Sequence, residues 1–211
     1  MSLLKHIRLN KAVKKLIVSD FFLQAGWGFT GPIFAIFLTK QIIDGSLQVV
    51  GIATAAYWII KSLVQPFFAY FLDKTEGERD DFIFLIIGMV IANLIPLGYI
   101  FVSYAWQIYF LEIVRGLAMA WVIPAWAAIF TRHIDKGKEA FSWSIESTAI
   151  GTAMGICAAL GAFLAAQFGF KIVFVLTSAF GLFATFILLG MSRHIFGRER
   201  ARYVFPFERP R

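Results

Sequence analysis

Hydrophobic residues along the chain fall into six long blocks that are separated by short polar segments. A helix rises about 1.5 Å per residue, so a block of about 20 residues can cross the roughly 30 Å hydrocarbon core of a bilayer. The pattern therefore predicts an all-α integral membrane protein, and the short connections predict that consecutive helices are antiparallel neighbours. We expect the transmembrane helices at residues 16–38, 47–72, 82–101, 106–130, 141–167 and 172–191.

The composition supports a membrane class and argues against an enzyme. Hydrophobic residues make up 59% of the chain and charged residues 16%, whereas soluble domains contain about 45–50% and about 25%. Cys157 is the single cysteine, and the three histidines (His6, His133 and His194) lie outside the apolar blocks without ligand spacing. We therefore expect no disulfide framework, no metal site, no cofactor and no nucleophile–base arrangement.

The positive charge marks membrane topology rather than a nucleic-acid surface. The net charge is +7, and 16 of the 20 Lys and Arg residues lie in the two tails and in the second and fourth loops. All four segments fall on one side of the predicted topology, while only Lys40 and Lys171 lie on the other. The positive-inside rule then predicts a multi-pass protein of the cell (inner or plasma) membrane with both termini cytoplasmic. We expect the first helix to be retained rather than cleaved as a signal, and the basic C-terminal tail to lie against the anionic leaflet.

Two segments 92 residues apart resemble each other. Gly31–Lys40 and Ile123–Arg132 share a proline, an alanine and a threonine in register and both end in a base, and the same offset places Asp20 over Glu112. Three helices separate the two copies, so they run in opposite directions and predict a 3+3 inverted repeat; chance similarity between apolar segments is the alternative. The predicted organisation is a basic tail at 1–15, repeats at 16–101 and 106–191, and a basic tail at 192–211.

Lys61 lies near the middle of the second predicted helix, with Trp58 and Gln65 one turn away on the same face. A charged side chain at the bilayer centre costs about 2.5–3.5 kcal/mol on insertion scales, so such residues usually face protein or water. We expect Lys61 to line a polar cavity and to contact an anionic group or a carboxylate partner. The alternative is a structural ion pair between helices.

Four further charged residues fall within the apolar blocks. Glu112 and Arg115 have i,i+3 spacing and can pair locally, either as a substrate or proton site or as a self-satisfied staple between helices. Asp20 and Gln24 share a helix face and either line the pathway or take a solvated interfacial position. Glu146 lies about one turn into its helix, and we expect it to pair with a basic loop residue.

A stripe of small residues on the fifth predicted helix includes Gly151, Gly155 and Ala159. Such spacing allows the backbone of another helix to approach closely. We expect this stripe to serve in generic helix packing.

Three motifs together resemble the major facilitator superfamily. The loop after the second helix, Ala69–Arg79, is similar to the family signature G-x-L-x-D-R/K-x-G-R/K-R/K, with Asp73, Lys74, Gly77 and Arg79 matching if one residue is inserted. Arg115-Gly116 resembles the family's arginine motif of helix 4, and residues 151–174 are similar to its passage from helix 5 to helix 6. The resemblance implies that the loop helps to close the cytoplasmic side and that the arginine takes part in proton coupling.

Members of this family usually have two six-helix halves with the substrate site between them, and this chain resembles one half. The resemblance implies a secondary transporter of a small solute that works by alternating access, with H⁺ as a candidate coupling ion. Because charged residues lie within the membrane without a second half to enclose them, we expect a homodimer of six-helix halves. Two alternatives stay open. The chain is a non-transporting membrane scaffold or assembly factor, or it is one half of a split transporter that pairs with another chain.

Overall fold

The computed structural model describes residues 9–74 and 78–191. This part of the chain forms six α-helices, each long and apolar enough to span a membrane, which confirms an all-α, multi-pass membrane protein. Gly77, the C-terminal tail and most of the N-terminal tail lie outside the described residues. The helices are α2 (Lys11–Gln41), α3 (Leu47–Lys74), α4 (Arg79–Gly98), α5 (Ala105–His133), α6 (Glu139–Phe168) and α7 (Phe170–Leu189).

The helix ends differ from the predicted ones where polar caps, rather than hydropathy, decide the boundary. The first helix begins at Lys11, because the side chain of Asn10 accepts a hydrogen bond from the backbone N–H of Val13 at 2.9 Å. An N-cap of this kind satisfies one of the free N–H groups at a helix start. The third helix ends at Gly98, before the predicted residue 101, and the chain turns there.

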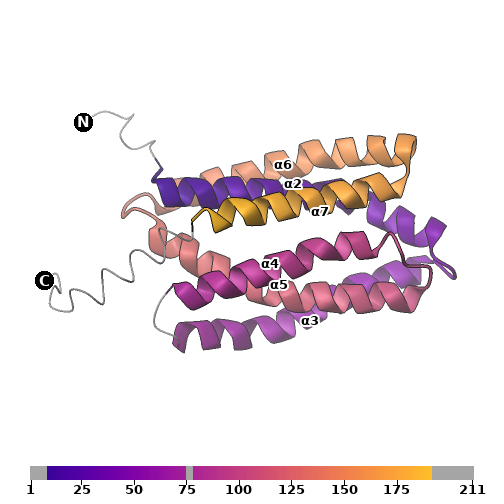
Figure 1. Cartoon of the computed structure of the whole chain (residues 1–211), viewed down its shortest axis with the longest axis horizontal. Coiled ribbons are helices and arrows are strands. Elements are labelled where there is room, and N and C mark those ends of the chain that lie inside the picture. Colours follow the sequence, from indigo (N-terminus) through magenta and orange to yellow (C-terminus); the bar gives the residue numbers. More distant parts are fainter. Residues whose placement is uncertain (1–8, 75–77, 192–211) are drawn as a thin grey trace, which may run out of the picture.

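The helices form two groups of three (Figure 1). In one group α2 packs against α6 and α7, and in the other α5 packs against α3 and α4. The prediction that consecutive helices are neighbours holds for α4–α5 and, more weakly, for α6–α7, but it is wrong for α3–α4 and α5–α6. A short loop fixes only where two helix ends meet, whereas matching side-chain surfaces along the helices decide which helices pack together.

The most extensive helix packings are kept when the first three helices are exchanged with the last three. The contact of α2 with α6 becomes that of α5 with α3, and the contact of α2 with α7 becomes that of α5 with α4. An inverted repeat requires this exchange. The arrangement thus supports the repeat that we propose from the sequence.

Glycines allow close approaches between the first three helices and the last three. A methyl group added at Gly161 of α6 would lie 2.2 Å from the carbonyl oxygen of Phe29 on α2. One added at Gly116 of α5 would lie 2.8 Å from the carbonyl oxygen of Tyr57 on α3. Small residues bring membrane helices into van der Waals contact in this way.

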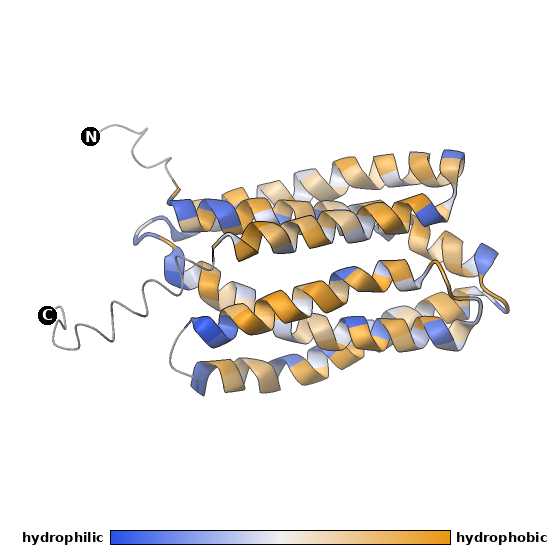
Figure 2. Ribbon diagram, viewed as in Figure 1, coloured by the Kyte–Doolittle hydropathy of each residue, from blue (hydrophilic) through white to orange (hydrophobic). Residues whose placement is uncertain are grey.

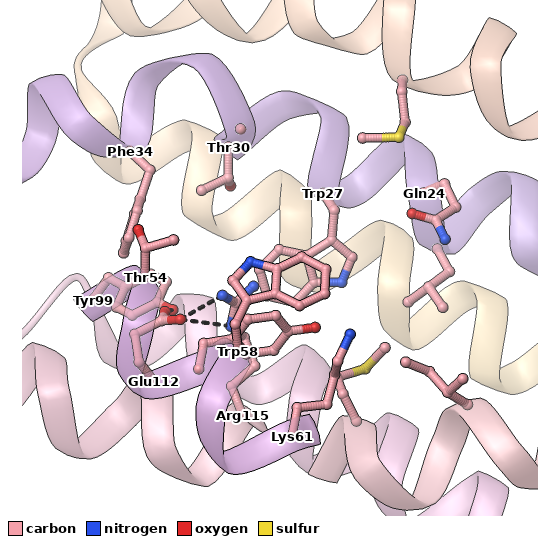
Figure 3. A pocket seen from close by; sticks show the side chains of 16 residues that line it. Gln24, Trp27, Thr30, Phe34, Thr54, Trp58, Lys61, Tyr99, Glu112 and Arg115 are labelled. Carbon is pink, nitrogen blue, oxygen red and sulfur yellow. Dashed lines mark hydrogen bonds and ion pairs between the residues drawn. The ribbon is translucent and has the colours of Figure 1, made fainter. Parts of the chain in front are cut away.

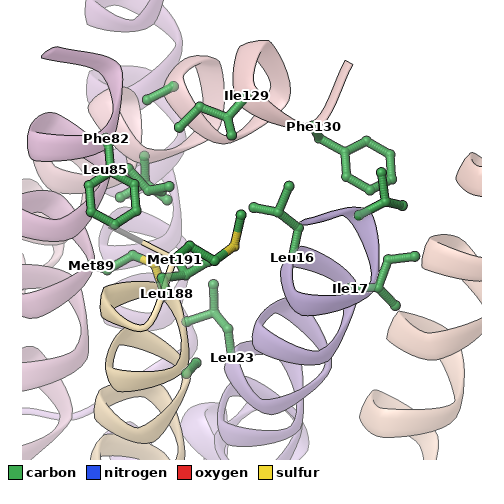
Figure 4. Close-up of a cluster of buried hydrophobic side chains, with 14 of the residues drawn as sticks. Leu16, Ile17, Leu23, Phe82, Leu85, Met89, Ile129, Phe130, Leu188 and Met191 are labelled. Atoms are coloured by element: carbon green, nitrogen blue, oxygen red, sulfur yellow. The ribbon is translucent and has the colours of Figure 1, made fainter. Parts of the chain in front are cut away.

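A buried cluster joins α2, α4, α5 and α7 at the end of the bundle where α2 begins (Figure 4), and includes Leu16, Leu85 and Ile129. Polar groups close the same end: Arg132 on α5 forms an ion pair with the fully buried Asp81 on α4. The amide of Asn10 donates to the carbonyl oxygen of His133. These contacts tie the starts of α2 and α4 to the end of α5. Between the two ends the helices are mostly hydrophobic (Figure 2).

Candidate functional site

A cavity of about 570 Å³ lies within the bundle, between α2, α3 and α5. Its volume is within the range of roughly 300–1,000 Å³ that is typical of small-molecule sites. Its wall combines aromatic side chains with a few polar ones (Figure 3). The aromatic residues are Trp27, Phe34, Tyr57, Trp58 and Tyr99, and the polar ones are Gln24, Thr30, Thr54, Lys61, Glu112 and Arg115.

Glu112 is the acidic group of the cavity, and its hydrogen-bonding capacity is largely used by neighbours. Its Oε2 accepts from Arg115 Nε at 3.1 Å and from Arg115 Nη2, and its Oε1 accepts from the hydroxyl of Tyr99. The guanidinium of Arg115 lies 3.9 Å from the ring centre of Tyr57 and 4.6 Å from that of Trp27. The i,i+3 pair that the spacing predicts is formed, and its two charges cancel inside the cavity.

Lys61 is the second cation of the cavity, and it is only 8% exposed. Its ammonium lies 3.7 Å from the ring centre of Trp58 and 5.5 Å from that of Tyr57. Among the described residues no carboxylate forms an ion pair with it. Gln65, which we expected on the same face, is half-buried and lies outside the cavity wall.

Asp20 lies beside the cavity rather than in its wall. Both Asp20 and Glu146 are 8% exposed, and their carboxyl groups are hydrogen-bonded to each other across α2 and α6. Asp20 is also hydrogen-bonded to Gln24, which does line the cavity. The expectation of a basic loop partner for Glu146 is wrong, because the close packing of α6 on α2 brings it to Asp20 instead.

The loop that resembles the family signature is partly described. Asp73 and Lys74 are exposed at the end of α3, and the ammonium of Lys74 lies 4.5 Å from the ring centre of Tyr70. Arg79 begins α4. The gating role of these residues stays a prediction.

The small-residue stripe of α6 faces away from the described bundle. A methyl group added at Gly151 or Gly155 would meet nothing within 4 Å, and Ala159 is exposed. Within this chain the close contact of α6 is made instead through Gly161. The stripe is therefore available to something outside the described chain.

Three aromatic residues of the site were not expected from the sequence. Trp27 follows Gln24 by three residues and Tyr57 precedes Lys61 by four, so helical spacing could have found both. Tyr99 lies beyond the end of α4, and only the packing of α4 on α5 brings its hydroxyl to Glu112. The sequence analysis also did not identify Asp81, which meets Arg132 only because α4 packs on α5.

Within residues 9–74 and 78–191 no group of three or more His, Cys, Asp or Glu side chains is placed to hold a metal ion. Fixed charges are instead gathered around a cavity that lies among membrane-spanning helices. In membrane proteins such groups mark the paths of solutes and ions. The fold and the site together define the class of polytopic helical transport proteins.

The family comparison agrees with this class. A family model described as Major Facilitator Superfamily matches residues 16–204, so the chain belongs to this superfamily, which is a family of transporters rather than of enzymes. Over 181 residues the chain is 25% identical to "Multidrug resistance protein 2" of Bacillus subtilis (strain 168). The match covers 85% of this chain and 44% of that protein, so the chain spans less than half the length of this relative.

Proposed function

We propose that this chain supplies half of a secondary transport pathway and moves a small solute across the membrane by alternating access. The cavity carries the proposal: buried Lys61 and Glu112 and half-buried Arg115 surround a space large enough for such a solute. Membership of the superfamily and the similarity to a multidrug resistance protein support it. Asp20 and Gln65, which lie off the cavity wall, belong in this proposal to the path that leads to it.

We also propose that two copies of the chain form the working unit. α3 and α6 bury only four and five residues, whereas α2 buries 14. Both helices contribute to the cavity wall, through Lys61 and Met154, and α6 carries the open stripe at Gly151 and Gly155. Two copies related by a two-fold axis along the membrane normal would have the same orientation and would enclose the cavity between them.

Proton coupling is the third part of the proposal, and the contact of Asp20 with Glu146 supports it. A hydrogen bond between two carboxyl groups needs a proton on one of them, because two carboxylates repel each other. The pair is linked through Gln24 to the cavity wall. Proton uptake and release at this pair could therefore respond to an occupied cavity.

We place the protein in the cell (inner or plasma) membrane with both termini cytoplasmic, on the charge distribution. α2 begins and α7 ends at the same end of the bundle (Figure 1). α3, with Asp73 and Lys74, ends there, and α4 begins there with Arg79. We propose that the segment between these helices, which includes Gly77, helps to close the cytoplasmic side.

Uptake by protein reconstituted in liposomes tests the transport proposal. Labelled solutes of anionic, neutral and cationic character are supplied with and without a pH gradient. We expect uptake of at least one class, which Arg115→Gln abolishes and which Lys40→Gln, at an exposed base outside the cavity, leaves unchanged. Failure to move any solute of a broad panel would favour the scaffold or assembly factor.

The oligomeric state is tested separately. Gly151→Cys places a thiol on the open stripe of α6, and we expect disulfide crosslinking between copies in native membranes. Native mass in mild detergent should give a dimer. A monomer without crosslinks contradicts the homodimer, and co-purification of a different six-helix chain favours the split transporter.

A further inference from the structure

The charges around the cavity do not balance. Glu112 and Arg115 cancel each other through two hydrogen bonds, and the second Glu112 oxygen is taken by Tyr99. The positive charge of Lys61 in the cavity wall is therefore not neutralised by any carboxylate of the described chain. The nearby Asp20 is hydrogen-bonded to Glu146 and Gln24.

The surroundings of Lys61 hold its charge without using its hydrogen-bond donors. An ammonium carries three N–H donors, and among the described residues the contacts of Lys61 Nζ are with the ring faces of Trp58 and Tyr57. Cation–π contacts offset only part of the effective cost of burying an unpaired ion. A buried polar group that lacks an acceptor and points into a cavity is suited to bind a ligand that supplies one.

Figure 3 shows the side chain of Lys61 pointing into the space between α2 and α3, toward the side on which Gln24 lies. The indole rings of Trp27 and Trp58 lie beside the same space. The cavity thus presents a positive group and flat apolar walls to the same occupant. That combination matches a molecule with one acidic group and an aromatic or otherwise apolar body.

We propose that the cavity selects small amphiphilic monoanions, above all aromatic carboxylates. Lys61 donates hydrogen bonds to the carboxylate, and the rings of Trp27, Tyr57 and Trp58 bind the apolar body. Arg115 is already paired with Glu112, which offsets its charge and accepts from its Nε and Nη2, so Lys61 is the group left to neutralise an anion. This inference rests on the proposed transport function and names its substrate class.

The test compares three probes of the same shape and different charge: 2-naphthoate, neutral 2-naphthamide and cationic 2-naphthylmethylammonium. Binding to the full chain in lipid nanodiscs is measured by equilibrium dialysis, with empty nanodiscs as the blank. A hydrogen-bonded charge pair contributes about 1.5–3 kcal/mol, so we expect naphthoate to bind at least about tenfold more tightly than naphthamide.

Variants of Lys61 test whether this residue causes the preference for naphthoate over naphthamide. Lys61→Gln should remove the advantage of naphthoate and weaken its binding far more than that of naphthamide, and Lys61→Arg should keep most of the advantage. Lys40→Gln, which removes an exposed charge outside the cavity, is the matched control and should change neither. Gel filtration of each variant checks that the fold is kept.

Equal binding of the acid and the amide, tightest binding of the ammonium probe, or no loss in Lys61→Gln would each overturn the anion preference. Transport measurements separate this failure from failure of the transport proposal. Movement of the amide or the ammonium probe without the acid leaves transport standing and refutes the inference. Selective binding of naphthoate without movement of any probe supports the anion site and contradicts transport.

Discussion

Two buried carboxyl groups at repeat-related positions are neutralised in different ways. Glu112 on α5 lies against a cation of its own helix and a tyrosine hydroxyl. Asp20, at the corresponding position of α2, lies against another acid, Glu146 of α6. The negative charge of Glu112 is balanced by Arg115. The Asp20–Glu146 pair avoids repulsion between two carboxylates only while one of them holds a proton.

The difference suggests different roles for α5, which carries Glu112, and α2, which carries Asp20. A buried ion pair has no proton to exchange while both partners stay charged, so it suits a fixed wall of a cavity. A carboxyl pair exchanges its proton with the surroundings, so it suits a variable element. We infer that the Glu112 region holds the cavity in shape and that the Asp20 region couples it to protons.

The largest effect should follow when the internal pair is broken. Arg115→Met leaves Glu112 buried with Tyr99 as its remaining partner, and we expect a loss of about 3 kcal/mol in the free energy of unfolding. Unfolding in mixed micelles with rising SDS, followed by tryptophan fluorescence, measures it. The double variant with Glu112→Gln should recover more than half of the loss, because no unpaired ion remains. Simple additivity of the two single variants would contradict the pairing.

The second effect concerns the contact that brings Asp20 to Glu146. Gly161→Ala forces α6 away from Phe29 on α2, and we expect a loss of about 1–3 kcal/mol in the free energy of unfolding. Gly151→Ala, on the open face of the same helix, is the matched control and should change stability by less than about 0.5 kcal/mol. Equal effects at the two glycines would mean that the packing of α6 on α2 is not close.

A smaller effect of opposite sign is expected at the unbalanced charge. Lys61→Met keeps an unbranched side chain beside Trp58 and removes a buried ion without an anionic partner. We expect the free energy of unfolding to rise by up to about 1 kcal/mol, in contrast to Arg115→Met. The same SDS titration measures it. A loss as large as that of Arg115→Met would show that Lys61 has a structural anionic partner.

The smallest change in stability should follow Asp20→Asn. An amide can donate to Glu146 and needs no shared proton, so we expect a change within about 1 kcal/mol. Solute uptake, however, should lose its dependence on the pH gradient, whereas Lys40→Gln should keep it. Uptake that stays driven by the gradient in Asp20→Asn and in Glu146→Gln would remove the carboxyl pair from the coupling.

Much of the fold follows from the sequence, because a bilayer restricts the possibilities. Blocks of about 20 apolar residues must be helices there, since every backbone N–H and C=O must be satisfied within the segment. The spacing of Glu112 and Arg115 predicted their pair for the same local reason. We predicted that Lys61 lines a cavity from one argument, which is the free-energy cost of burying its charge in the bilayer.

Other features depend on contacts between distant segments. Short loops suggested that neighbours in sequence pack together, but Gly161 and Gly116 bring α6 to α2 and α5 to α3. The packing of α6 on α2 decided that Glu146 meets an acid rather than a base, and the packing of α4 on α5 brought Tyr99 to Glu112.

The sequence by itself determined the class of protein, the number of membrane helices and the presence of charge within them, because hydropathy and local spacing carry this information. Only the tertiary structure decided which of these charges neutralise each other, and that Lys61 has no anionic partner among the residues that the structure describes. Pairing of that kind depends on side chains from different helices meeting within a few ångströms, and helix packing sets those distances.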